Sequence, residues 1–135
     1  YTAHSSFDTH AAQLTVHAQL WREVSEAIAA FFEDLRQHNA AEDVIMLLWS
    51  EFGRRVRDNG SGTDHGAGGL ALVLGDTIKG GMYGETPSLR DGHLTLGNLR
   101  YNNDFRSTYS TILERCFQVE ARPIVNGNFE QFAFV

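Results

Sequence analysis

Asp64 and His65 are the adjacent side chains best suited to chemistry in this 135-residue chain. They lie in the glycine-rich stretch NGSGTDHGAGG, where the backbone can bend tightly and approach whatever the two side chains hold. Carboxylate oxygen and imidazole nitrogen are ligands that suit Zn²⁺ or Mn²⁺. The alternative is a loop aspartate that forms a local turn beside a solvated histidine, and the spacing alone favours that alternative.

Arg54 is a candidate anion-binding residue, because a guanidinium group can hold phosphate or sulfate through two parallel N–H groups. It comes shortly after the apolar run 44–49, VIMLLW, which predicts a strand buried on both faces. Polar side chains at the carboxyl end of such a strand lie where open α/β sheets place their ligand sites. An ion pair with Glu51 or Asp58 explains Arg54 equally well.

The composition is that of a globular protein, with 42% hydrophobic and 21% charged residues. The net charge of −6 disfavours nucleic acid as a partner, because an acidic surface repels phosphate backbones. The single cysteine, Cys116, excludes an internal disulfide and is typical of a buried structural thiol. No apolar run approaches the roughly 20 residues needed to span a bilayer.

A long amphipathic helix is predicted from near Ala11 to about Gln37, with Asp8 or Thr9 as a possible cap. Its apolar residues recur at intervals of three, four and seven. They are Leu14, Trp21, Val24, Ile28, Phe31 and Leu35.

Further elements follow the glycine-rich stretch. The run 70–74, LALVL, predicts a second interior strand, and residues 76–102 show no clear period. A second amphipathic helix is predicted to begin at Asn103 or Asp104 as its cap. Near the carboxyl end, the pair Asn126–Gly127 predicts a turn between apolar pieces that are weakly strand-like.

Five motifs occur along the chain in this order: FDTH, SEFGRR, NGSGTDHG, LVLGDTIKGGMYGE and DFRSTYSTILE. In these motifs and their order the chain resembles the carboxyl-terminal part of the bacterial DUF1501 proteins, which are grouped with the alkaline phosphatase and sulfatase superfamily. It implies that residues 1–135 are the carboxyl-terminal part of a single alkaline-phosphatase-like domain. The implied fold is α/β, a three-layer α/β/α arrangement of which this chain supplies only part of the sheet. Family members are commonly exported, so the resemblance also implies a periplasmic or exported location.

The resemblance also assigns candidate metal ligands. In that superfamily an adjacent Asp-His pair ligates one metal ion, which implies that Asp64 and His65 are ligands. A second pair is usually an Asp and a His separated by three residues, and its nearest match here is Asp8 and His10, with one residue between them. Capping of the first helix is the alternative for Asp8. The superfamily's nucleophile lies further upstream and has no counterpart in these residues, so the catalytic residue is unknown.

The implied function is that of a metal-dependent hydrolase of phosphate or sulfate esters, with a divalent ion such as Zn²⁺ or Mn²⁺ and a small-molecule substrate. It would act as part of a longer protein, and this chain alone is expected to be inactive. The alternative is a non-catalytic binding or assembly module that keeps the fold without a nucleophile. Two strands and two helices make about half of a doubly wound sheet, which predicts that the chain needs the rest of its parent protein or a second copy for stability.

Overall fold

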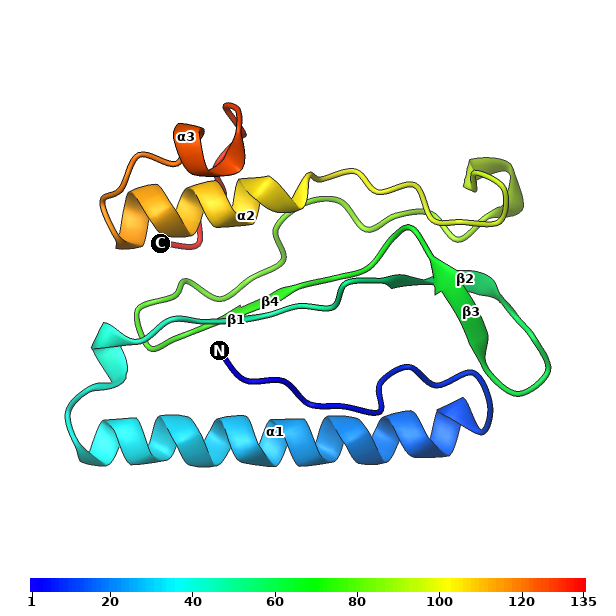
Figure 1. Cartoon of the computed structure of the whole chain (residues 1–135), viewed down its shortest axis with the longest axis horizontal. Coiled ribbons are helices and arrows are strands. Elements are labelled where there is room, and N and C mark those ends of the chain that lie inside the picture. The colour runs from blue at the N-terminus through cyan, green and yellow to red at the C-terminus, as the bar shows by residue number, and fades with distance from the viewer. The chain divides into compact units, whose positions relative to one another are not determined.

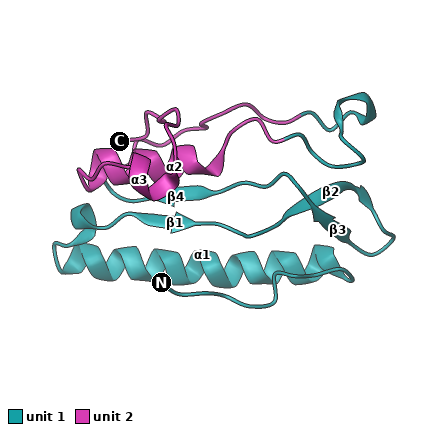
Figure 2. Ribbon diagram, turned by 45° about the horizontal axis from the view of Figure 1, so that its top comes forward, with its two compact units in different colours: residues 1–76, 88–100 teal, residues 77–87, 101–135 magenta.

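The computed structural model describes residues 1–135 and divides into two compact units. Unit 1 contains residues 1–76 and 88–100, and unit 2 contains residues 77–87 and 101–135 (Figure 2). Unit 1 holds one long helix and two antiparallel sheets of two strands each, whereas unit 2 is built from short helices and irregular segments. The chain is therefore a mixed helix and sheet protein, broadly α/β.

The predicted long helix is confirmed as α1 (Gln13–Gln37) (Figure 1). Its buried residues are Leu20, Val24 and Phe32. They follow each other in steps of four and eight residues, which keeps them on one face of an α-helix. The predicted apolar stripe is wrong at two positions, because Leu14 is 90% exposed and Phe31 is 42% exposed. Phe32 takes the inward position instead, since neighbouring residues on a helix point about 100° apart.

The amino terminus of α1 has no side-chain cap of its own. Ala12 adopts a left-handed conformation with φ 50°, and its N–H donates to Ser61 Oγ at 2.8 Å. The N–H of Gln13 donates to the Ser61 carbonyl oxygen at 3.1 Å. The prediction that Asp8 or Thr9 caps this helix is therefore wrong, because a residue far along the chain satisfies its first donors.

The two apolar runs form short strands, β1 (Met46–Leu48) and β4 (Leu72–Leu74). They pair with each other in antiparallel fashion, with Leu47 opposite Val73. The expected interior strands of a parallel sheet are not found, and no residue of either strand is fully buried. A parallel pair needs a long crossover, usually a helix, and here the chain between the strands forms a hairpin that reverses its direction.

That hairpin consists of β2 (Gly53–Asp58) and β3 (Thr63–Gly66). Arg54 lies opposite His65, and the register shifts between Arg54 and Asp58. The sequence suggested a glycine loop at the carboxyl end of a strand, and this is wrong: Arg54, Asp64 and His65 all lie within strands. Only the four residues from Asn59 to Gly62 form the loop. Gly60 has φ 99° there, a conformation that other residues rarely adopt.

In unit 2, the predicted cap at Asp104 is confirmed. Its carboxylate accepts a hydrogen bond from the Arg106 N–H at 2.9 Å at the start of α2 (Phe105–Thr111). The helix continues as a π-helical turn, η3 (Ile112–Cys116). The buried residues of α2 are Ser107, Ser110 and Thr111. This face is small and polar rather than apolar. The Thr111 hydroxyl donates to the Ser107 carbonyl oxygen and accepts from the Phe132 N–H, whereas the Ser110 hydroxyl is buried without a partner.

The carboxyl-terminal segment contains a short helix, α3 (Arg122–Val125). Asn126 ends it in the left-handed conformation, with φ 55°. The predicted turn is found at Asn126, but the prediction of strand-like flanks is wrong, since no strand lies on either side of it. The pair serves instead as a helix carboxyl-terminal cap, another common use of a residue that tolerates positive φ.

Two single turns of 3₁₀ helix complete the elements: η1 (Ala41–Asp43) after α1, and η2 (Asp91–His93) in the stretch for which the sequence predicted no structure. No helix of the chain combines the length and the apolar character that crossing a membrane requires.

Candidate metal centre

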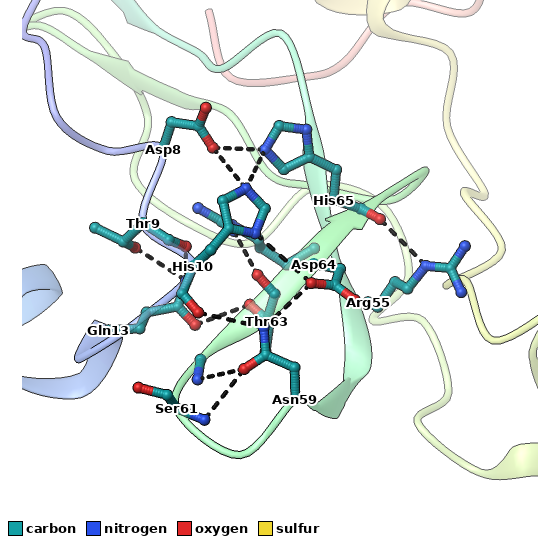
Figure 3. Close-up of polar contacts among 12 residues, drawn as sticks. Asp8, Thr9, His10, Gln13, Arg55, Asn59, Ser61, Thr63, Asp64 and His65 are labelled. Atoms are coloured by element: carbon teal, nitrogen blue, oxygen red, sulfur yellow. Dashed lines mark hydrogen bonds and ion pairs between the residues drawn. The ribbon is translucent and has the colours of Figure 1, made fainter.

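The segment before α1 folds back along that helix (Figure 1). It carries Asp8 and His10 to the hairpin, where they contact His65 and Asn59 (Figure 3). The ring of Phe7 packs edge-on against Trp21 and His17 of α1, with ring centroids 5.5 and 5.7 Å away. These contacts anchor the segment through an aromatic side chain. Asp8 and His10 are thereby brought beside the strand that carries His65, although Asp8 and His65 are 57 positions apart in the sequence (Figure 3).

Three ligand atoms meet at one point, from Asp8, His10 and His65 (Figure 3). Asp8 Oδ1 lies 2.6 Å from His65 Nε2 and 3.0 Å from His10 Nε2, and the two Nε2 atoms are 3.2 Å apart. Each Nε2 carries at most one hydrogen and an ionised carboxylate carries none. At most two of the three contacts can therefore be hydrogen bonds at once, and a cation among the atoms would satisfy all three.

The geometry fits a tetrahedral ion. Ligand atoms about 2.0 to 2.1 Å from Zn²⁺ stand roughly 3.3 Å apart in a regular tetrahedron, so the three observed separations would need to widen by about 0.1 to 0.7 Å. Two imidazole nitrogens and one carboxylate oxygen are a donor set that suits Zn²⁺ or Mn²⁺. The three side chains are between 45% and 61% exposed, which leaves one side of the cluster open to solvent.

Asp64 contributes to the cluster differently from its neighbour His65. Asp64 is not among the three residues whose ligand atoms converge. Its Oδ1 lies 3.6 Å from His10 Nδ1 and accepts a hydrogen bond from Asn59 Nδ2 at 3.1 Å. Three of the four residues from the two predicted pairs thus gather around one point, and the fourth lies against the far nitrogen of His10. Metal ligation by any of the four stays a prediction.

Both carboxylates are held in the ionised form that metal binding requires. The hydrogen bond from His65 lowers the pKa of Asp8 below its usual range. The hydrogen bond from Asn59 lowers the pKa of Asp64 in the same direction, and His10 adds to the effect. Asp8 and Asp64 therefore both carry a negative charge at neutral pH.

Arg54 links the two segments that carry the converging ligands. Its Nη1 donates to the Thr63 carbonyl oxygen at 2.6 Å, and its Nη2 donates to the Phe7 carbonyl oxygen at 2.9 Å. It forms no ion pair with Glu51 or Asp58. The two carbonyl bonds give Arg54 a structural role that the sequence did not suggest, and anion binding by this residue stays a prediction.

Phe52 is a residue of the site that sequence reasoning missed. Its ring stacks on His65 with centroids 4.0 Å apart and planes 9° from parallel. The guanidinium of Arg54 lies 5.0 Å from the centre of the Phe52 ring. The stack fixes the plane of the His65 imidazole. The available signal was position: Phe52 and Arg54 are two residues apart, so they share one face of an extended strand.

Asn59 is the second residue that was missed. Its side-chain oxygen accepts hydrogen bonds from the N–H groups of Ser61 and Gly62, at 3.1 and 2.9 Å, and thereby shapes the hairpin loop. Gly62 is needed there, because a Cβ atom at this position would lie 3.0 Å from the His10 carbonyl oxygen. The signal was the Asn-Gly pair itself, since Asn side chains commonly bond to the backbone two residues further on.

Residues 2–112 match the family described as "Protein of unknown function (DUF1501)". The match covers most of the chain and both segments of the cluster, so the chain belongs to the DUF1501 family. This confirms the family part of the resemblance that the five motifs indicated. No curated protein and no solved structure matches the chain.

Proposed function

We propose that Asp8, His10 and His65 bind one divalent cation, Zn²⁺ or Mn²⁺, and that this site belongs to a hydrolase of phosphate or sulfate esters. The observation that carries the proposal is the three-way contact of the ligand atoms, which the available protons cannot satisfy. A bound cation would supply Lewis-acid chemistry to an ester oxygen. Because only three side chains converge, a coordination position is left for substrate.

The residues around the cluster have distinct parts in this proposal. Arg54 holds the two ligand-bearing segments together, and Phe52 keeps the His65 ring in its plane. The exposure of the cluster allows a small ester to reach it from solvent. No nucleophile is assigned among the residues of this chain. Cys116 is a poor candidate, because burial raises the pKa of its thiol and so lowers its thiolate fraction at neutral pH.

The proposal extends to the alkaline phosphatase and sulfatase superfamily, with its three-layer α/β/α fold, and to a periplasmic or exported location. Its support is that two motifs which carry the resemblance, FDTH and TDHG, lie far apart in the sequence and meet in space through Asp8, His10 and His65. This convergence is what a single site built from both motifs would produce.

The remaining layers would come from the rest of a parent protein or from a second copy. The support is the small size of the β1–β4 sheet, since two strands alone are marginally stable in water. Apolar side chains beside it are exposed, including Trp49 at 50% and Leu70 at 71%. Light scattering tests this part: a dilution-resistant monomer of 15.1 kDa with a cooperative melt would contradict it.

The metal proposal is tested by titrating the chain with Zn²⁺ and Mn²⁺ in a calorimeter. His65→Ala should weaken binding by about 100-fold or more, because it removes one of three ligands. His93→Ala is the matched control, since His93 is an exposed histidine outside the cluster, and it should leave binding unchanged. Equal affinities of the two variants would contradict the proposal.

The hydrolase proposal needs its own assay, with an aryl phosphate and an aryl sulfate as substrates and a longer DUF1501 protein containing this chain as the enzyme. Turnover should stop when a chelator removes the ion and return when Zn²⁺ or Mn²⁺ is restored. Turnover that survives both the chelator and His65→Ala would show that the cluster is not its catalytic centre.

A non-catalytic module is the second candidate, because the cluster also fits a structural metal site. Its ligands come from segments 57 positions apart, so a bound ion would close a long loop and stabilise the folded chain. In that case Zn²⁺ should raise the melting temperature while the longer protein shows no turnover of either ester. The two measurements together separate this function from the hydrolase.

A further inference from the structure

We propose that Asp64 is a positioning residue, which orients His10 for the cation and does not itself bind it, with Asn59 holding Asp64 in place. This inference rests on the proposed metal site. It departs from the resemblance, which implies that Asp64 and His65 are both ligands, by assigning different roles to these adjacent residues. The geometry separates them: His65 Nε2 is one of the converging atoms, and the Asp64 carboxylate is turned to the other side of His10 (Figure 3).

The two nitrogens of His10 face different partners. Nε2 points to Asp8 Oδ1 and His65 Nε2, at 3.0 and 3.2 Å. Nδ1 points to Asp64 Oδ1 at 3.6 Å. This is an ion-pair distance, and a movement of about 0.5 Å would turn it into a hydrogen bond. An imidazole that binds a metal through one nitrogen commonly donates its other N–H to a carboxylate, and His10 is placed for that arrangement.

Asn59 fixes the position of the Asp64 carboxylate. Its Nδ2 donates to Asp64 Oδ1 at 3.1 Å and to the His10 carbonyl oxygen at 3.2 Å. Its oxygen accepts from the backbone N–H groups of Ser61 and Gly62. Rotating the amide by 180° would set its NH₂ group against two N–H donors, so the loop allows only this orientation. One side chain therefore ties both Asp64 and the backbone of His10 to the same loop.

The consequence is control of the His10 tautomer. A carboxylate beside Nδ1 favours the form with the proton on Nδ1, which leaves the lone pair on Nε2 free for a cation. The same carboxylate stabilises a ring that donates electron density to a metal. Partners of this kind commonly change metal affinity by about 10- to 100-fold when they are removed.

Cobalt binding by the full chain tests the inference, because the visible spectrum of Co²⁺ reports the ligand set separately from the affinity. Asp64→Ala should weaken Co²⁺ binding by about 10- to 100-fold, with the spectrum of the saturated variant unchanged. Asp64→Asn keeps an oxygen that can accept from Nδ1 and should show a smaller loss. Glu51→Gln is the matched control, since it removes one exposed charge next to β2, and it should bind as the unmodified chain does.

A second readout is the proton on His10, followed by proton–nitrogen NMR of the zinc-loaded chain. The proton should be on Nδ1 and protected from exchange, and in Asp64→Ala that protection should be lost. If Asp64→Ala fails to fold by circular dichroism, Asp64→Asn gives the decision through Co²⁺ binding. Weaker binding with an unchanged spectrum would support the inference, and unchanged binding would overturn it.

The failures can be told apart. An unmodified chain that binds neither Co²⁺ nor Zn²⁺ would overturn the proposed metal site, and the role of Asp64 with it. A chain that binds Co²⁺, but whose saturated spectrum changes in the Asp64 variants, would show that Asp64 is a ligand and overturn only this inference. Unchanged affinity in both Asp64 variants would overturn it as well.

Discussion

The region around the candidate metal centre and the helices of unit 2 are kept in shape by different interactions. In the first, the converging side chains are at least 45% exposed, and directional bonds from Arg54 and Asn59 hold the backbone segments that carry them. In unit 2, Thr111, Ala121 and Phe134 are at most 3% exposed. The difference indicates which substitutions should harm each region. Unit 2 should be destabilised by changes of side-chain volume and by unpaired buried polar groups, and the candidate metal centre by changes of hydrogen-bond geometry.

The largest expected effect on stability is in unit 2. Phe134→Ala removes a buried ring that packs edge-on against Tyr83 with centroids 5.7 Å apart. It should lower the free energy of unfolding by about 3 to 4 kcal/mol, as core Phe to Ala changes do, measured by urea denaturation. Phe105→Ala is the control, since Phe105 is 70% exposed, and it should change the free energy by less than about 0.5 kcal/mol. Similar losses of unfolding free energy in the two variants would contradict the difference in burial between Phe134 and Phe105.

Two neighbouring hydroxyl groups of α2 should respond in opposite ways. Thr111 Oγ1 donates to the Ser107 carbonyl oxygen and accepts from the Phe132 N–H at 2.9 Å. Thr111→Val leaves that N–H unpaired and should cost about 2 kcal/mol in thermal unfolding. Ser110 Oγ is buried without a partner, so Ser110→Ala should be neutral or stabilising. A cost for Ser110→Ala equal to that for Thr111→Val would contradict the assignment of these bonds.

A smaller effect on stability is expected from Arg54, with a clear effect on the metal. Arg54→Lys keeps the charge, but one ammonium on a flexible stem cannot hold the Phe7 and Thr63 carbonyl oxygens in the geometry of a planar guanidinium. We expect a loss of about 1 kcal/mol of stability and roughly 10-fold weaker Zn²⁺ binding. Arg57→Lys in the same strand is the control. If calorimetry gives the two variants comparable Zn²⁺ affinities, Arg54 does not hold the ligand-bearing segments in the geometry that the ion needs.

The smallest effect concerns the cap of α2 and depends on pH. Asp104→Ala should cost about 1 kcal/mol at pH 7, the usual value for a lost cap. Arg106 lowers the pKa of Asp104 from 3.8 to about 2. A lowered pKa in the folded state means that the stabilisation is fully present above about pH 4 and is lost as pH falls towards 2. The difference between Asp104→Ala and the unmodified chain should therefore shrink over that interval in urea titrations. A difference that stays constant down to pH 2 would contradict the ion pair.

Features that depend on neighbours in the sequence could be predicted. The periodicity of α1, the apolar runs of β1 and β4, and the cap at Asp104 are local signals, and each was found. The pairing of β1 with β4 could not be predicted, because an apolar run carries no information about which strand it pairs with. The hairpin that reverses the chain was predicted to be a loop.

The candidate site shows the same limit. Residue types and family resemblance pointed to Asp8, His10, Asp64 and His65, and the structure gathers them. Which nitrogen of His10 faces which carboxylate depends on distances that no spacing encodes. Asn59 and Phe52 were missed because their roles come from contacts: one bonds to His10 from 49 positions away, and the other stacks on a ring across a hairpin.

The way in which Ser61 receives the first N–H groups of α1 determines where the chain tolerates insertions. Ser61 lies outside the helix and accepts hydrogen bonds from the N–H groups of Ala12 and Gln13. Ala12 and Gln13 therefore cannot move along the helix axis without losing these hydrogen bonds. One residue added just after Gln13 would turn the rest of α1 by about 100° and move Leu20, Val24 and Phe32 off their buried face. One residue added among the first three, which lie before any helix or strand, would move none of them. Ser61 therefore sets the rotational phase of a helix that lies almost fifty residues before it.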